Sequence, residues 1–410
     1  MNRSLIILLF SFLFSYDSYI SFYGSGEKLS NLNPSNISLG WSKLFDSNTY
    51  HKIGSLSSLY QSDMVRLSMA SDFNFNEINQ NVYFSQKLNY FSFLFPIKNN
   101  KQSLGISLAP FYRINSNIIE SEFSFVEGNE DNPPLAYKTE YDFDGGPSIA
   151  SIMLSSLGFN KNNLKFSWGL QLNYIFGSLY SHKAYNTYDI IYDQDGNMST
   201  SNPYTEYSTT INSYDGYGVE MQFSIKSNFY GKENEFITSF NMVDNINIIE
   251  SFYDDIVPEA LELGISPDEE KAYKISSPFE FNIGYSYQLN KNDRFIIEYY
   301  NYSPYDSDSN SNLFSNSDVN KERLSVGYYK SLFDDKISVS SGLYNIDTYN
   351  DNLTSNKKGL TLGLGIYSVK NLSIDFCLEI GQNKIEINDP LSEKYVNLYL
   401  GLTASDRWFK

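Results

Sequence analysis

The stretch NLKFSWGLQLNYIFG, residues 163–177, alternates between two kinds of side chain. From Leu164 to Phe176 every second residue is apolar or aromatic, and the residues between them are mostly polar or small. A period of two indicates a β-strand whose two faces meet different surroundings. The apolar face therefore lies either against a second sheet, as in a soluble sandwich, or against lipid.

The same alternation recurs along the chain, and two kinds of connection separate the alternating segments. The alternating segments are 218–226, 279–288, 359–366, 371–381 and 396–402. Tight polar turns are predicted at 98–101, 160–163, 231–234, 290–293, 334–335 and 369–371. Longer polar and acidic segments are predicted at 115–146, 181–213, 248–276, 303–319, 347–357 and 382–392. Short turns at one end and long loops at the other are typical of an outer-membrane barrel, with the turns periplasmic and the loops extracellular.

Strands placed between these connections give a count of fourteen. They are expected at 62–73, 82–95, 101–118, 147–158, 163–180, 214–230, 232–247, 277–289, 292–303, 320–331, 335–346, 358–369, 371–382 and 393–408. An even number with both termini periplasmic suits a single-chain bacterial barrel. Residues 135–144 and 184–192 are either two further strands or extensions above the membrane. The predicted fold is all-β, a closed antiparallel transmembrane β-barrel of about fourteen strands with an N-terminal plug.

Composition agrees with a membrane barrel and excludes other classes. The 410 residues include 35 Tyr and 30 Phe, and barrels carry aromatic girdles at both lipid interfaces. The formal charge of −18 argues against a nucleic-acid partner, which requires clustered Lys and Arg. The single cysteine, Cys377, excludes an internal disulfide framework.

The N-terminal residues are predicted to form a signal peptide followed by a plug inside the barrel. MNRSLIILLFSFLFS has a charged start and a short apolar core, which favours a cleaved secretory signal over residues 1–18; a buried first strand is the alternative. Residues 19–61 are predicted to form a plug and 62–410 the barrel, in the outer membrane of a diderm (Gram-negative-type) bacterium. The plug is preferred over a periplasmic linker because several apolar side chains require burial. These are Ile37, Leu39, Trp41, Leu44 and Phe45.

Three stretches resemble the FadL-like outer-membrane transport proteins. The triplet Asn33-Pro34-Ser35 resembles the Asn-Pro-Ala motif of that family, with Ser35 in place of the usual alanine. FPIKNNKQSLGISLAPFYRIN (95–115) and DGGPSIASIMLSSLGFNKNNLKFSWGLQLNYIFGS (144–178) resemble its Bacteroidetes-type branch. The resemblance implies a fourteen-stranded barrel with an internal N-terminal plug. It also implies a role in moving hydrophobic molecules inward or in assisting secretion.

Pro110 lies inside the predicted third strand, LGISLAPFYRI. Proline lacks the N–H that a strand ladder needs, so it marks an edge, a bulge or a break. In the FadL-like family the third strand is broken to form a lateral exit, and the resemblance implies such an exit at Pro110. A bulge near the membrane rim is the alternative interpretation.

The segment DDIVPEALELGISPDEEK, residues 254–271, is the one stretch predicted to be helical. Pro258 suits a first turn, Gly264 a helix stop, and Ser266-Pro267-Asp268-Glu269 the start of a second helix. Such a loop would cap the lumen and capture an amphipathic ligand through Pro258, Leu261 and Leu263. The alternative is a solvated loop helix.

Several inward-facing positions on the predicted strands are polar, and both charge signs occur. The polar residues are Lys165, Gln171, Asn173, Glu220, Gln222, Lys226, Glu280, Asn282, Asp375 and Glu379. They either pair with one another and fill the interior or line a path. The predicted ligand-binding or gating residues are Asn33, Pro34, Pro110, Lys165, Gln171, Asn173, Glu220, Lys226, Pro258, Leu261 and Leu263.

No catalytic site, cofactor or metal site is predicted. The two histidines are His51 and His182, and the neighbouring Ser181 lies on the opposite face of its strand from His182. DQDGN at 193–197 resembles the start of a calcium loop, but Tyr204 stands where the loop needs a Glu. A barrel enzyme is therefore not expected.

The favoured function is passive uptake of hydrophobic or amphipathic, fatty-acid-like molecules, captured at the extracellular loops and released laterally near Pro110. A non-transporting scaffold that binds a secreted or periplasmic protein is the main alternative, and a general diffusion porin is a third. The expected partners are outer-membrane lipid, a hydrophobic small molecule and, in the second case, a protein.

Overall fold

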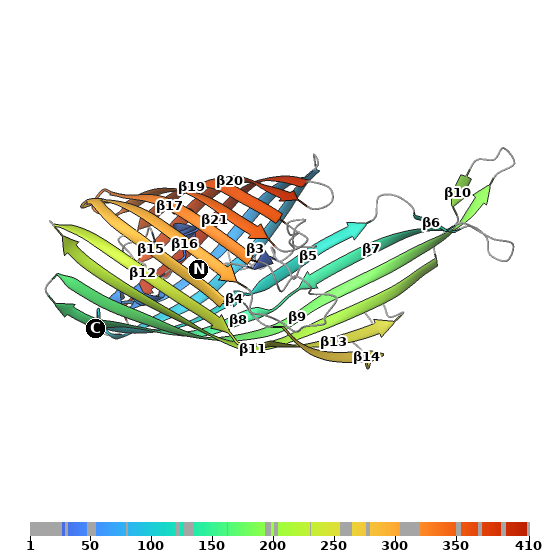
Figure 1. Cartoon of the computed structure of the whole chain (residues 1–410), viewed down its shortest axis with the longest axis horizontal. Coiled ribbons are helices and arrows are strands. Elements are labelled where there is room, and N and C mark those ends of the chain that lie inside the picture. Colours follow the sequence, from blue (N-terminus) through green and yellow to red (C-terminus); the bar gives the residue numbers. More distant parts are fainter. Residues whose placement is uncertain are drawn as a thin grey trace.

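The computed structural model describes residues 27–28, 32–46, 55–78, 81–119, 124–126, 135–161, 163–192, 198–200, 204–229, 231–254, 265–275, 279–303, 320–349, 354–367, 371–386 and 391–407. Fourteen strands pair in chain order around a barrel (Figure 1). They are β2 (Val65–Ile78), β3 (Asn81–Lys98), β4 (Gln102–Pro110), β8 (Ser148–Lys161), β9 (Leu164–Tyr192), β11 (Tyr204–Phe229), β12 (Lys232–Val243), β15 (Phe279–Asn290), β16 (Asp293–Ser303), β17 (Asn320–Leu332), β18 (Ile337–Tyr349), β19 (Thr354–Tyr367), β20 (Leu372–Glu386) and β21 (Leu391–Asp406).

The barrel closes between its first and last strands. β2 pairs antiparallel with β21 over the whole run from Val65↔Asp406 to Ile78↔Glu393. Every neighbouring pair in the ring is antiparallel. The predicted closed barrel of fourteen strands is confirmed.

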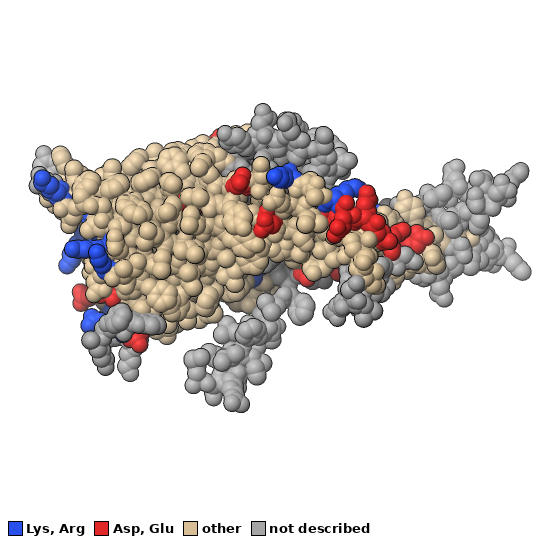
Figure 2. All heavy atoms as spheres, turned by 90° about the horizontal axis from the view of Figure 1, so that it is seen from below, with Lys and Arg blue, Asp and Glu red and all other residues tan. Residues whose placement is uncertain are grey.

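The apolar face of residues 163–177 points away from the interior. Leu172 is 51% exposed and Tyr174 is 40% exposed, whereas Asn173 between them is 5% exposed. On the face shown in Figure 2, the barrel wall carries almost no Lys, Arg, Asp or Glu between its two ends. The wall is therefore solvated by lipid, and no second sheet covers it.

The short turns lie together at one end of the barrel, where the C-terminus also lies (Figure 1). Three of them contain an asparagine with positive φ: Asn100 (54°), Asn163 (65°) and Asn371 (64°). Asparagine tolerates this left-handed conformation better than most residues with a side chain. The polar residues of the predicted turns therefore reverse the chain tightly, which fixes strand order at this end.

At the opposite end, one side of the barrel continues into a tall sheet, here called the arm. It comprises β5 (Tyr112–Ile119), β6 (Ser124–Val126), β7 (Leu135–Gly145), β10 (Met198–Thr200), β13 (Ile246–Asp254), β14 (Glu269–Ile275) and the distal halves of β9 and β11. Residues 135–144 pair with 180–189 and residues 190–192 pair with β10, all within the arm, so the two predicted segments are extensions above the barrel. Figure 2 shows acidic side chains gathered on the arm.

The second helix predicted at Ser266–Glu269 is wrong. Glu269 opens β14, whose residues pair with β13 from Phe252↔Glu269 to Ile246↔Ile275. The Asp268 carboxylate accepts from the backbone N–H of Asp254 at 2.8 Å, so the expected helix cap instead stabilises the strand pair. Pairing with a neighbouring strand overrides the local helix-start pattern.

Backbone kinks mark the junction between barrel and arm. Gly145, Gly146 and Gly177 have positive φ (101°, 122° and 119°), and the N–H of Gly146 donates to the carbonyl of Ser178 at 2.8 Å. β9 pairs with β8 up to Phe176 and with β7 from Leu179 onward. Glycine permits this change of partner because it adopts positive φ without steric cost.

An inner segment, defined as residues 32–46 and 55–63, contacts inward-facing residues of the barrel. It contains α3 (Pro34–Ile37) and the 3-10 helix η1 (Leu56–Gln61), and β1 (Glu27–Lys28) precedes it. Ile37, Leu39, Leu44 and Phe45 are all at most 3% exposed, as their predicted need for burial requires. Within the described residues, no helix is long and apolar enough to cross a membrane.

Candidate functional site

Glu298 on β16 anchors the middle of the inner segment. Its carboxylate accepts from the Ser42 hydroxyl at 2.6 Å and from the N–H groups of Lys43 and Leu44 at 2.9 and 3.0 Å. Arg323 on β17 donates to the same carboxylate at 2.7 Å. A buried carboxylate with four donors is fully compensated, so this contact fixes the segment against the wall.

Glu379 on β20 is a second anchor. It accepts from the indole N–H of Trp41 at 2.8 Å, from Asn397 at 2.9 Å, and from the hydroxyls of Tyr344 and Tyr399. The Trp41 ring also meets Tyr344 and Tyr399 edge-on, with centroids 6.2 and 6.1 Å apart. One carboxylate therefore joins the segment to three strands of the wall, β18, β20 and β21.

Lys43 connects the inner segment to strands on the side of the lumen opposite Glu379. Its ammonium lies 3.2 Å from Glu220 on β11 and 3.5 Å from Glu280 on β15. Burial lowers the pKa of Lys43, but the two carboxylates outweigh it, and the pKa lies above its usual value. The lysine therefore stays charged and is the shared ion-pair partner of the two acidic residues.

The second part of the inner segment, around η1, contacts strands β4, β8, β9 and β11. Gln222 accepts from the Ser57 N–H at 2.6 Å and from the Ser55 hydroxyl at 3.0 Å. The Lys165 ammonium lies 5.1 Å from the centre of the Tyr60 ring, a cation–π contact. The two parts of the segment thus occupy different sectors of the lumen.

Asn33 and Pro34 lie at the start of α3. The Asn33 side chain accepts from the Ser35 N–H at 3.4 Å, the local bond expected of this residue, and Pro34 occupies the first helical position. The predicted turn is a single helical turn. A Cβ at Gly401 of β21 would lie 2.9 Å from Pro34, so the turn packs directly on the wall.

The segment approaches β18 so closely that only glycine fits there. A Cβ at Gly342 would collide with the backbone nitrogen of Gly40. A Cβ at Gly327, the cross-strand partner of Gly342 on β17, would lie 2.9 Å from the carbonyl oxygen of Leu39. Backbone meets backbone at this point, and the approach requires residues without side chains.

The strand ladder of the wall is interrupted beside Pro110. β3 pairs with β4 only from Lys98↔Gln102 to Phe91↔Leu108, and β4 ends at Pro110. The chain then continues into β5, which pairs with β7 and β1. Within the described ranges, β3 residues 81–90 have no strand partner on the side away from β2. The wall therefore has an unpaired edge on the arm side of Pro110.

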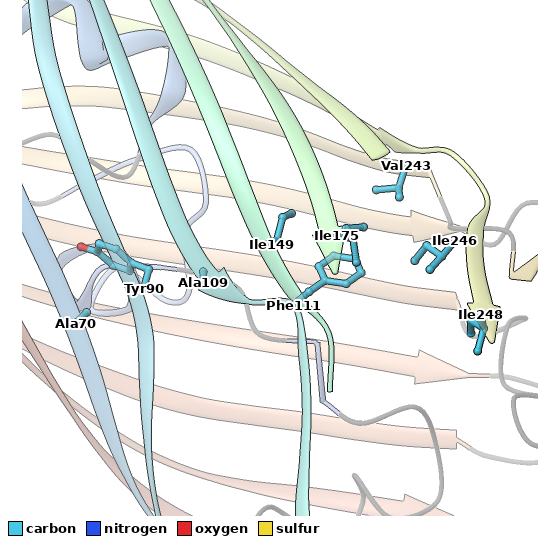
Figure 3. Close-up of a cluster of buried hydrophobic side chains, with 9 residues drawn as sticks. All are labelled: Ala70, Tyr90, Ala109, Phe111, Ile149, Ile175, Val243, Ile246 and Ile248. Carbon is cyan, nitrogen blue, oxygen red and sulfur yellow. The ribbon is translucent and has the colours of Figure 1, made fainter. Parts of the chain in front are cut away.

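An apolar cluster lies inside the barrel next to this edge (Figure 3). Phe111 directly follows Pro110, is 3% exposed, and lies beside Ile175 and Ile149 in Figure 3. The cluster is completed by Ala70, Tyr90, Ala109, Val243, Ile246 and Ile248. The Tyr90 hydroxyl is buried here and has no hydrogen-bond partner among the described residues.

The predicted lumenal residues divide into two groups. Glu220 and Lys165 contact the inner segment. Gln171 donates to Asn173 at 2.8 Å within β9. The Lys226 ammonium on β11 lies 3.1 Å from the Glu235 carboxylate on β12, so this contact, too, is confined to the barrel wall. Pro258, Leu261 and Leu263 lie outside the described residues.

Sequence reasoning missed Glu298 and Arg323. Both occupy inward-facing positions: Glu298 stands between apolar Ile296 and Tyr300 in FIIEYY, and Arg323 stands on the polar face of KERLSV. That phase was the available signal, but it does not reveal that both residues serve the same anchor. In the described part of the chain, no group of three or more His, Cys, Asp or Glu side chains is placed to hold a metal ion.

Comparison with known proteins identifies the family and supports the fold. A family model described as BamG matches residues 5–410. A FadL homologue from Pseudomonas aeruginosa aligns with a TM-score of 0.52 and 11% identity, covering 92% of this chain and 98% of that one. The TodX monoaromatic hydrocarbon channel, as its deltaS2 mutant, aligns with a TM-score of 0.51 and 10% identity, covering 92% and 99%. No curated protein matches the chain significantly.

The solved structures confirm a FadL-type barrel, while membership of the Bacteroidetes-type branch stays a prediction. The family match extends over almost the entire sequence, including the inner segment, the barrel and the arm. The chain belongs to the BamG family.

Proposed function

We propose that this outer-membrane barrel mediates passive uptake of hydrophobic or amphipathic small molecules. The observation that carries the proposal is the position of the apolar cluster around Phe111, beside the unpaired edge of β3. Buried apolar side chains at an interruption of the wall ladder give an apolar molecule a surface along which to leave the lumen without crossing the polar end of the barrel. The shared fold with a monoaromatic hydrocarbon channel supports this reading.

The route begins at the arm and ends beside Pro110. A ligand captured on the extracellular side passes along the apolar cluster that includes Ile149, Ile175 and Ile248 and leaves between β3 and β5 into the membrane. Pro110 keeps this path available because it ends β4 and cannot donate a ladder hydrogen bond. No energy source or covalent step is needed.

The inner segment acts as the plug in this mechanism. Its first part is bound to the wall by Glu298 and Glu379, and its second part, around η1, is bound by Gln222 on another strand. The segment is therefore held across the lumen. A plug fixed in this way blocks free aqueous flow toward the short-turn end. Lateral release is then the exit open to an apolar molecule.

The buried Tyr90 hydroxyl, which has no hydrogen-bond partner among the residues that the structure describes, suits an amphipathic ligand. A buried polar atom without a partner costs free energy, about 1–3 kcal/mol. A ligand whose polar group bonds Tyr90 while its apolar part contacts Phe111 would recover that cost. Fatty-acid-like molecules have this combination of groups.

The test is uptake of a radiolabelled long-chain fatty acid by cells that carry variants at matched outer-membrane levels. Pro110→Val is expected to extend the β4 ladder and reduce uptake several-fold while the barrel stays folded. Pro96→Val is the matched control, since Pro96 lies on β3 within the ladder to β4. Uptake by Pro110→Val equal to that of the wild type would remove the lateral exit. Absence of uptake in the wild type relative to barrel-free cells would remove the transport function.

A second function, a scaffold for a protein partner, is favoured by a different observation. The arm is an extracellular sheet with an acidic face, and the inner segment is fixed by several buried polar contacts rather than by one. A closed lumen and a large external sheet suit a structural role. Retention of a protein by the full-length barrel, lost when residues 255–264 are replaced by a short glycine linker, would support the scaffold over uptake.

A further inference from the structure

A groove of about 920 Å³ lies on the wall formed by β17–β21 and β2. Most of the side chains that line it point outward, away from the inner segment and its anchors. Leu343 is 58% exposed and Ile380 is 47% exposed, whereas Tyr344, one residue along from Leu343, is 4% exposed and faces the lumen. The groove therefore opens toward lipid.

Strand register arranges the groove in two rows. One row is apolar and crosses six strands through directly paired residues: Val326, Leu343, Leu360, Ile380, Val396 and Phe75. The next row toward the loop end is polar: Asn345, Lys358, Gln382, Lys394 and Glu77. Two residues along a strand separate the rows, which is about 7 Å.

The two rows coincide with the edge of the apolar band. On β20 the outward residues from Leu372 to Ile380 are apolar, and polar Gln382 and Lys384 follow. Lipid headgroups lie at this boundary and acyl chains below it. The groove is therefore positioned at the headgroup region of the leaflet on the arm side, the outer leaflet.

Lys358 and Lys394 are the basic residues of the polar row, and Glu77, the cross-strand partner of Lys394, is its one acidic residue. Both lysines are exposed, and neither forms an ion pair with a carboxylate of the described residues. They are basic residues on a protein with a net charge of −18, and lysine side chains at an interface extend their ammonium groups toward headgroups. The arrangement matches an anionic headgroup held above acyl chains.

We propose that this groove binds one phosphate-bearing lipid of the outer leaflet. The phosphate contacts Lys358 and Lys394 and accepts from Gln382, and its acyl chains lie on Leu343, Leu360 and Ile380. A free phosphate would leave the apolar row unused, and an uncharged lipid would offer no negative charge to the two lysines, which the single carboxylate of the row, Glu77, cannot balance. The lipid is a fixed component of the wall and takes no part in the lumenal route.

Native mass spectrometry of the full-length protein in detergent tests the proposal with two lipids of equal chain length. Dimyristoyl phosphatidylglycerol carries the phosphate, and the matching monogalactosyl diacylglycerol is uncharged. The double variant Lys358→Gln/Lys394→Gln is compared with Lys161→Gln/Lys336→Gln, two exposed lysines at the short-turn end. A gel shift on heating shows that each variant is folded.

The wild type and the control variant are expected to retain phosphatidylglycerol in preference to the galactolipid. The groove variant is expected to bind it about 30-fold more weakly, from about 1 kcal/mol per interfacial lysine. Excess inorganic phosphate should leave retention unchanged. Equal retention of both lipids, or equal retention by the groove variant and the wild type, would overturn the proposal. So would protection of both lysines from amine acylation by a co-purified protein with no bound lipid.

Discussion

The indole N–H of Trp41 donates to the carboxylate of Glu379 at 2.8 Å, across a sequence separation of 338 residues. Trp41 has φ of +63°, a conformation that is rare for a residue of this size. The surrounding contacts with Tyr344 and Tyr399 hold it there. Trp41 thus links the inner segment to the C-terminal strands β18, β20 and β21.

Replacing Glu379 by glutamine should weaken the contact between Trp41 and β20. The amide removes the charge that strengthens four hydrogen bonds, at a cost of about 1.5–3 kcal/mol to the docking of the inner segment. Limited trypsin digestion should then cut at Lys43 faster than in the wild type. Glu386→Gln, an exposed carboxylate at the end of the same strand, should leave the digestion rate unchanged. Equal protection of Lys43 in both variants would show that Glu379 does not hold the segment.

Gly342→Leu should expel the inner segment while the barrel remains closed. The added side chain occupies the position of the Gly40 backbone, so the segment must leave that part of the lumen. In planar bilayers, the variant should show stable ion conductance well above that of the wild type. Ser341→Leu places the same side chain on the outer face of the strand and should conduct like the wild type. A closed Gly342→Leu barrel would contradict the role of the segment as a plug.

Arg323→Met should be more harmful than removal of its entire ion pair. The single variant leaves the buried Glu298 carboxylate without its cation, which typically costs about 3–5 kcal/mol. The double variant Arg323→Met/Glu298→Gln removes the buried charge but keeps an amide oxygen that can accept from the inner segment, so it should recover part of that stability. The readout is the temperature at which the folded barrel changes mobility in a denaturing gel. A double variant less stable than Arg323→Met would refute this account.

Tyr90→Phe should separate amphipathic ligands from pure hydrocarbons. The change removes a buried hydroxyl that has no partner among the described residues, so stability should stay the same or rise. Uptake of a long-chain fatty acid should fall by about tenfold, the value of one hydrogen bond, and uptake of an alkylbenzene should not. If uptake of the fatty acid and of the alkylbenzene fell equally, Tyr90 would contribute to the packing of the apolar cluster and would not bond the ligand.

The barrel could be predicted from sequence because its rules are local. Alternation such as that of residues 163–177 defines each strand, and residues such as Asn163 and Asn371 define the tight turns. Strand count, pairing order and closure follow from these two signals. The helix start at Ser266 failed for the converse reason, since pairing of β14 with β13 decided its structure.

The candidate site was less accessible to the sequence. The need to bury Leu39 and Leu44 was visible, but their location was not. Glu298 and Arg323 show an inward phase, yet their meeting with Ser42 depends on which strands face each other across a closed ring. The break beside Pro110 was indicated by its chemistry, whereas the unpaired length of β3 required the pairing pattern of its neighbours.

The anchors of the inner segment also have a consequence for biogenesis. Glu298, Arg323 and Glu379 belong to β16, β17 and β20, which the ribosome makes long after residues 32–46. A chain that stops short of these strands has neither the β2–β21 seam nor a place to hide Leu39 and Leu44. Truncated products therefore expose the apolar side chains of residues 32–46 to periplasmic chaperones and proteases, and only the complete barrel buries them.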